Sequence, residues 1–126
     1  MIPSFHCSDA GRSIYAPAEK NDCTVRAVAA AFGVPYPEAH NRLALLGRQP
    51  RQGMHFGVYA ERLGLLAREE LSWIRLHEVM PKLDPAKCFI ITTATHAFAV
   101  VRGTIWDSLL PKATTKTMMV YEVPIL

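Results

Sequence analysis

The stretch CFIITTATHAFAVVRGTIWD, residues 88–107, decides the fold class of this chain. Its runs of β-branched and aromatic residues predict three strands, over residues 88–93, 96–101 and 104–106. The dipeptide Arg102-Gly103 separates the last two runs and is a candidate two-residue hairpin turn. A later apolar run, residues 118–123, predicts a closing strand. The C-terminal part of the chain is therefore expected to form an antiparallel sheet.

Helical patterns dominate the part of the chain that precedes this sheet. Asp22 can cap a helix whose apolar residues recur at helical spacing as far as Gly33, which suits a left-handed C-terminal position. Further helices are expected over residues 37–46, 54–63 and 76–83. We expect a short strand from residues 65–66 and 71–73, and an irregular leading segment over residues 1–20. Helices followed by an antiparallel sheet are the α+β pattern.

The composition of the chain fits one compact domain. A length of 126 residues and a mass of 14.0 kDa predict a single domain over residues 1–126, with one active site or one binding face. No apolar run reaches the roughly 18 residues of a membrane span, and the first residues do not form a signal peptide. We therefore expect a cytoplasmic protein that does not bind membranes. The net charge is +3 and the basic residues are scattered, so nucleic acid binding is not indicated.

Cysteine usage points to one reactive thiol. Cys7, Cys23 and Cys88 include no Cys-x-x-Cys pair and are odd in number, so all three are expected to be reduced. Cys23 falls in the first turn of a predicted helix, where free backbone N–H groups and the helix dipole favour a thiolate. Cys7 and Cys88 are interpreted as packing residues. A zinc cluster of these two cysteines with His6 would lack close ligand pairs, so we expect no metal and no other cofactor.

A nucleophilic cysteine needs a base within hydrogen-bond reach and a third group that orients the base. Among the five histidines, His96 is distinguished because it stands at the start of a predicted strand. The hairpin turn would bring the next strand back alongside, and so return the carboxylate of Asp107 to the neighbourhood of His96, where it could orient the imidazole. The expected register pairs Val101 with Thr104, Val100 with Ile105, Ala99 with Trp106, and Phe98 with Asp107.

Each of these residues also has an ordinary structural explanation. Cys23 alone would be a small buried core residue, His96 a strand histidine, and Asp107 an exposed acid near a turn. Arg26 fits a surface charge, a partner for Asp22 or a residue of a cleft, and we favour a structural role. The combination of the cysteine, the histidine and the aspartate is what indicates chemistry.

Three strings of the sequence resemble papain-like cysteine peptidases: NDCTVRA at residues 21–27, HAFAVVRG at residues 96–103, and Asp107-Ser108. More narrowly, they are similar to small phage and bacterial proteins with an NDC helix start and a hairpin of the form HA…V…G…D. The resemblance extends over residues 20–110. It implies a papain-like fold, in which a helix with the nucleophile at its N-terminus packs on an antiparallel sheet that carries the base.

The resemblance also implies roles for individual residues. Cys23 matches the nucleophile, His96 the general base and acid, and Asp107 the residue that orients the base. Papain-like peptidases usually place a glutamine several residues before the cysteine, and this chain has no glutamine on the N-terminal side of Cys23. The backbone N–H of the cysteine could supply one donor of an oxyanion hole, and the side chain of Asn21 or Lys20 a second.

Two classes of function follow. The first is a thiol-dependent hydrolase that acts on an amide: a cysteine peptidase in its plainest form, with deamidation, transglutamination and cleavage of a peptidoglycan amide open to the same residues. The second is a catalytically weak or inactive papain-like scaffold that acts as a phage or bacterial protein-binding factor. The intact triad residues favour the first class, and the absent glutamine and the small size favour the second. A protein or peptide partner is expected, in the host cytoplasm if the protein is phage-encoded.

Overall fold

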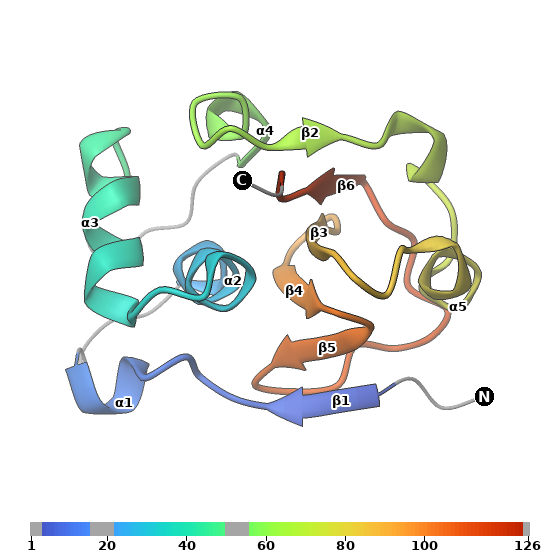
Figure 1. Cartoon of the computed structure of the whole chain (residues 1–126), viewed down its shortest axis with the longest axis horizontal. Coiled ribbons are helices and arrows are strands. Elements are labelled where there is room, and N and C mark those ends of the chain that lie inside the picture. The colour runs from blue at the N-terminus through green and yellow to red at the C-terminus, as the bar shows by residue number, and fades with distance from the viewer. Residues whose placement is uncertain (1–3, 16–21, 50–55, 125–126) are drawn as a thin grey trace.

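A computed structural model of the chain describes residues 4–15, 22–49 and 56–124. Its architecture is α+β, with helices packed on a mixed β-sheet (Figure 1). No helix in these ranges has the length and the apolar character needed to cross a membrane. In chain order the elements are β1 (Ser4–Cys7), α1 (Arg12–Tyr15), α2 (Cys23–Phe32), α3 (Tyr36–Leu45), α4 (Phe56–Tyr59), β2 (Leu66–Ala67), the 3-10 helix η1 (Glu69–Leu71), α5 (Leu76–Val79), the 3-10 helix η2 (Met80–Lys82), β3 (Cys88–Thr92), β4 (Ala97–Val101), β5 (Thr104–Asp107) and β6 (Met119–Glu122).

The β4–β5 hairpin has the turn that the sequence predicts and three of the four predicted residue pairs. Within the described residues the strand order is β1-β5-β4-β3-β6-β2, and β3 pairs antiparallel with both β4 and β6. The hairpin register runs from Val101 opposite Thr104 to Ala99 opposite Trp106. The turn residues Arg102-Gly103 have φ values of 46° and 83°. Positive φ at both positions is the geometry of a two-residue type I′ turn, so the prediction is confirmed.

The N-terminal segment corrects the prediction of an irregular stretch over residues 1–20. Ser4–Cys7 forms β1, which pairs in parallel with β5 and places His6 opposite Trp106. Arg12–Tyr15 forms the short helix α1. The hairpin leaves free backbone groups along the outer edge of β5, and β1 pairs with them. The parallel pairing of β1 with β5 makes the sheet mixed rather than purely antiparallel. It joins two segments that lie far apart in the chain.

Two hydrophobic cores lie on opposite faces of the sheet, because successive side chains of a strand point to opposite faces. On one face α2 packs on the central strands, and α3 covers the outer side of α2 (Figure 1). On the other face α5 and the neighbouring 3-10 helices form the second core. The first core includes Val25, Val28, Leu43, Ile90 and Ala99, and the second includes Leu76, Val79, Phe89, Ile91 and Phe98.

The helix α2 follows its local sequence. Val25 and Val28 are fully buried on its apolar side, and the helix ends at Gly33, whose φ of 66° and backbone N–H bonds to Ala29 and Ala30 form a left-handed cap. This prediction is confirmed. Asp22 stands at the N-cap position but makes no side-chain cap hydrogen bond, so the prediction that its side chain caps the helix is wrong.

The other predicted elements are found in part. Of the predicted helix over residues 37–46, residues 37–45 are helical in α3, and residues 76–83 contain α5 followed by η2. The helix expected over residues 54–63 is reduced to α4, and residues 54–55 lie outside the described ranges. Of the residues expected to form a short strand, only Leu66 lies in one, the two-residue strand β2 (Leu66–Ala67). Residues 71–73 instead complete η1 and a turn in which Trp73 has φ 61°, a conformation that a strand does not contain.

Candidate functional site

Cys23 is the first residue of α2 and lines a surface groove of about 640 Å³. The next helix residues, Thr24 and Val25, are buried, whereas Cys23 is half-buried. Backbone N–H groups in the first turn of a helix have no acceptor within the helix, and the helix dipole is positive there. Both effects favour negative charge on the thiol. His96 lines the same groove and brings an imidazole to it.

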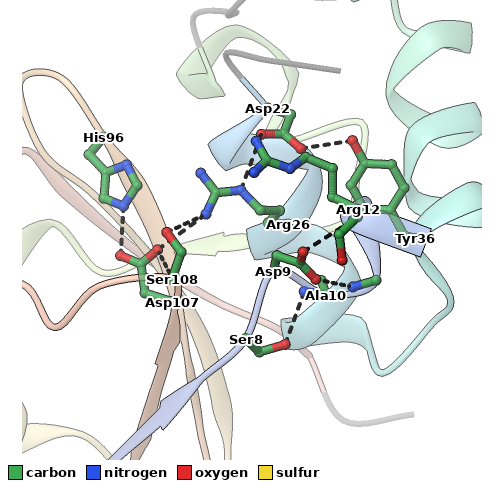
Figure 2. A network of polar contacts seen from close by, with 12 residues as sticks. Ser8, Asp9, Ala10, Arg12, Asp22, Arg26, Tyr36, His96, Asp107 and Ser108 are labelled. Carbon is green, nitrogen blue, oxygen red and sulfur yellow. Dashed lines mark hydrogen bonds and ion pairs between the residues drawn. The ribbon is translucent and has the colours of Figure 1, made fainter. Parts of the chain in front are cut away.

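His96 directly precedes β4, and its imidazole contacts Asp107 at the end of β5 (Figure 2). The distance from Nε2 of His96 to Oδ2 of Asp107 is 2.6 Å. Thr93 donates from its backbone N–H to the carbonyl of His96 at 2.8 Å and so closes the β3–β4 loop. Asp107 is 6% exposed, and its Oδ1 accepts the backbone N–H of Ser108 at 2.8 Å. The carboxylate is thus held in one orientation toward the imidazole.

The ionisation of the thiol and that of the imidazole are coupled. Burial alone would raise the pKa of the Cys23 thiol, but hydrogen bonds with His96 and the backbone of Ala97, and the charges of His96 and Arg26, lower that pKa below its ordinary value. The hydrogen bond with Asp107, followed by that with Cys23, raises the pKa of His96 to about 9 against the opposing effect of burial. Because Nε2 contacts the carboxylate, Nδ1 is the ring nitrogen left for the thiol. The arrangement favours a thiolate and an imidazolium over the neutral pair.

Arg26 connects the start of α2 to the end of β5 (Figure 2). Its Nε donates to Oδ1 of Asp22 at 3.2 Å, and its Nη1 donates to Oγ of Ser108 at 2.9 Å. The same Nη1 lies 3.5 Å from Oδ1 of Asp107. The side chains of the two aspartates are only 1% and 4% exposed. One guanidinium therefore compensates two buried carboxylates, one of which contacts the imidazole.

Asp22 has partners on both carboxylate oxygens. Oδ1 pairs with Arg26 and with Nη1 of Arg12, the latter at 3.5 Å, and Oδ2 accepts the hydroxyl of Tyr36 at 2.8 Å. These contacts explain why the carboxylate does not cap the helix: it is used for ion pairs and for a bond to α3. They also tie α1 and α3 to the residue that precedes Cys23. Of the alternatives considered for Arg26, pairing with Asp22 is observed.

The groove beside Cys23 is lined mainly by apolar side chains from separate segments of the chain. Phe56 and Val58 come from α4, and Trp73 follows η1. Met118 directly precedes β6, and Tyr121 lies within it. Val58, Trp73 and Met118 are 69%, 66% and 40% exposed. The described residues that line the groove include no Lys, Arg, Asp or Glu. The groove therefore presents an apolar surface next to the thiol.

Cys23 and His96 line one groove and the imidazole of His96 contacts Asp107, although the three residues come from α2, from the β3–β4 loop and from β5. Asn21 and Lys20, the two expected side-chain donors of an oxyanion hole, lie outside the described residues. The backbone N–H of the cysteine, at the first position of α2, is free of an intrahelical acceptor and remains a candidate donor.

The other two cysteines stand apart from this site. Cys7 is exposed because β1 is an edge strand, which corrects its interpretation as a packing residue, and its Sγ donates to the carbonyl of Ser108 at 3.4 Å. Cys88 is half-buried at the start of β3. In the part of the chain that the structure describes, no three His, Cys, Asp or Glu side chains are grouped so that they could hold a metal ion.

Sequence reasoning missed the bridging role of Arg26 and the composition of the groove. Arg26 carried a partial signal, because its spacing of four residues from Asp22 allows an ion pair on one helix face. The sequence around Trp73 carried no signal of a place in the groove, because that segment was expected to be a strand. The position of Trp73 depends on contacts with the distant segment that leads into β6.

Comparison with known proteins gives no family for this chain. A scan against protein-family models, a search of curated proteins and a search of solved structures each found no match. The function must therefore be inferred from the side chains themselves. A thiol paired with an imidazole that a carboxylate orients, beside an open groove, is able to carry nucleophilic attack on a carbonyl group.

Proposed function

We propose that this protein is a cysteine hydrolase that cleaves an amide bond of a protein or peptide, on a papain-like scaffold. The observation that carries the proposal is the placement of Cys23 and His96 in one groove, with the imidazole of His96 in contact with Asp107. A buried structural cysteine needs no such partners, whereas a nucleophilic cysteine needs both. The order of the elements supports the papain-like class, because the helix that begins with the cysteine packs on the strands next to the histidine and the aspartate.

In the first half of the proposed reaction, the Cys23 thiolate attacks the carbonyl carbon of the amide, and the π electrons of the carbonyl move to its oxygen. The His96 imidazolium then donates its Nδ1 proton to the amide nitrogen. The carbon–nitrogen bond breaks, the amine leaves, and the acyl group remains on the cysteine as a thioester.

In the second half, neutral His96 accepts a proton from water as the water oxygen attacks the thioester carbon. The carbon–sulfur bond breaks, the acid leaves, and the thiolate and the imidazolium are restored. Asp107 keeps its charge throughout and holds the imidazole with Nδ1 toward the sulfur. The backbone N–H of Cys23 is placed to stabilise the oxyanion, and Asn21 or Lys20 remains the proposed second donor.

The pH dependence of alkylation at each cysteine tests this proposal. We would treat the folded protein with iodoacetamide between pH 5 and pH 9 and measure the labelling of each cysteine by peptide mapping. We expect Cys23 to react selectively near pH 7, because its pKa is lowered, and to lose that selectivity in His96→Ala. Cys7, which is exposed, provides an internal control for reagent and accessibility.

Two results would count against the proposal. The first is slow labelling of Cys23 across the whole pH range. The second is a labelling profile that is the same in the wild type and in His96→Ala. Either result would leave a papain-like scaffold that binds a protein partner without cleaving it.

A further inference from the structure

Trp73 combines a strained backbone with an exposed side chain. Its φ of 61° lies in the left-handed region, which is strained for a bulky residue and is normally occupied by Gly, Asn or Asp. Its side chain is 66% exposed, so burial within this chain compensates little of that cost. Residues that are held in a strained conformation cluster at functional sites.

Hydrogen bonds to one buried residue hold this backbone in place. The backbone N–H of Trp73 donates to the carbonyl of Thr117 at 2.8 Å, and the N–H of Thr117 donates to Ile74 at 2.9 Å. The hydroxyl of Thr117 donates to the carbonyl of Leu71 at 2.7 Å, and Thr117 is 1% exposed. The turn is therefore rigid. It presents the indole in the groove that Cys23 also lines.

The hydrogen-bond pattern also gives the spacing between Trp73 and the reacting groups. Ala97, next to His96, pairs with Thr92 on β3. The carbonyl of Thr92 accepts the backbone N–H of Met118 at 2.7 Å. Thr117, which directly precedes Met118, accepts the backbone N–H of Trp73. These three steps between hydrogen-bonded backbones correspond to roughly 14 Å between Ala97 and Trp73, at about 4.8 Å per step. An extended peptide covers that distance in about four residues.

We propose that Trp73 determines the substrate specificity of the groove, by contacting a bulky apolar side chain of the polypeptide substrate within about four residues of the bond that Cys23 attacks. This inference rests on the proposed function and narrows its substrate class to extended polypeptide segments with an apolar anchor. Met118 and Val58 are exposed beside the indole in the same groove and complete an apolar surface for that anchor. A small amide would be too short to reach both the thiol and the indole.

Digestion of a proteome-derived peptide library tests the assignment, because sequencing the new termini by mass spectrometry reads both sides of each cleaved bond. The variants are Trp73→Gly and Trp73→Asn, which remove the indole and suit the observed φ. Leu45→Ala, at an exposed apolar residue of α3 outside the groove lining, is the matched control. Iodoacetamide labelling of Cys23 is measured in parallel on every protein.

We expect the wild type and Leu45→Ala to enrich Leu, Phe, Met or Trp at one position within four residues of the cleaved bond. In both Trp73 variants, that enrichment should fall by a factor of at least about ten. Their labelling of Cys23 should be unchanged, and their melting temperatures equal to or above that of the wild type.

Two results would overturn this inference alone, and a third would overturn it together with the proposed function. Cleavage by the wild type with a preference that survives in both Trp73 variants would contradict it and leave the proposed function intact. Unfolding of both variants would assign the indole a structural role. No cleavage by the wild type, together with unselective labelling of Cys23, would instead contradict the proposed function.

Discussion

Nη1 of Arg26 lies 3.5 Å from Oδ1 of Asp107, the carboxylate whose other oxygen contacts the imidazole of His96 (Figure 2). The contact joins a helix to a strand across the site, and the same guanidinium pairs with Asp22 next to Cys23. The start of α2 and the carboxylate that contacts the imidazole are therefore linked through one partly buried guanidinium. A substitution at Arg26 is therefore expected to change both the stability of the fold and the geometry of the site.

Replacing Arg26 by Gln should destabilise the protein strongly. The change leaves the buried carboxylates of Asp22 and Asp107 without their shared cation, and breaking a buried ion pair from one side costs about 3 kcal/mol. Arg42→Gln is the matched control, because its pair with Glu38 at 2.8 Å is exposed and should contribute less than about 1 kcal/mol. Urea denaturation of both variants measures the two losses, and equal losses would contradict the bridging role.

Replacing Asp107 by Asn should lower the pKa of His96 from about 9 toward 6.5, because the hydrogen bond with the carboxylate is the largest cause of the raised value. The expected decrease exceeds about one unit, since the amide carries no charge. NMR titration of the His96 ring measures it, and Glu38→Gln, an exposed carboxyl on α3, is the control. A pKa that stays near 9 in Asp107→Asn would show that the carboxylate does not control the imidazole.

The free energy of unfolding should respond to pH differently once the thiol is removed. The raised pKa of His96 stabilises the folded state below its unfolded value of 6.5, and that contribution is lost as the pH rises through about 9. The lowered pKa of Cys23 acts in the opposite sense, because it adds stability as the pH rises toward the unfolded value of the thiol. In the wild type the two contributions therefore oppose each other as the pH rises.

In Cys23→Ala only the contribution of His96 remains, so the free energy of unfolding should fall as the pH rises above 6.5. The His96 side chain is 34% exposed, so we expect about 0.5–1 kcal/mol per pH unit rather than the full value for one proton. Urea denaturation of both proteins at half-unit pH steps measures the slopes. Parallel slopes would mean that the thiol and the imidazole are not coupled.

The hairpin turn can be strengthened or weakened without touching the site. Arg102→Asn creates an Asn-Gly turn at positions that both have positive φ, and should stabilise the protein by about 0.5–1 kcal/mol. Gly103→Ala places a Cβ at φ 83° and should cost about 1 kcal/mol, although no atom lies within 4 Å of the added carbon. Thermal unfolding measures both changes. The same sign for the two variants would contradict the turn type.

The sequence by itself determined the elements that depend on neighbouring residues. The helix α2 follows from the apolar spacing between Cys23 and Gly33, because the pattern of a helix repeats over a few residues. The β4–β5 register follows from the Arg102-Gly103 turn, because a two-residue connection allows only one alignment of its strands. The approach of Asp107 to His96 was therefore predictable before any tertiary contact was known.

Only the tertiary structure decided the features that join distant segments. The parallel pairing of β1 with β5, the bridge from Arg26 to Asp107, and the placement of Trp73 in the groove each combine residues more than 40 positions apart. Such contacts form because burial removes water from charges and apolar surfaces of the whole chain at once, and that gain has no local period or spacing in the sequence. The grouping of His96 and Asp107 with a helix-start cysteine is thus predictable from the sequence, whereas its electrostatic support and the surface beside it arise only in the folded chain.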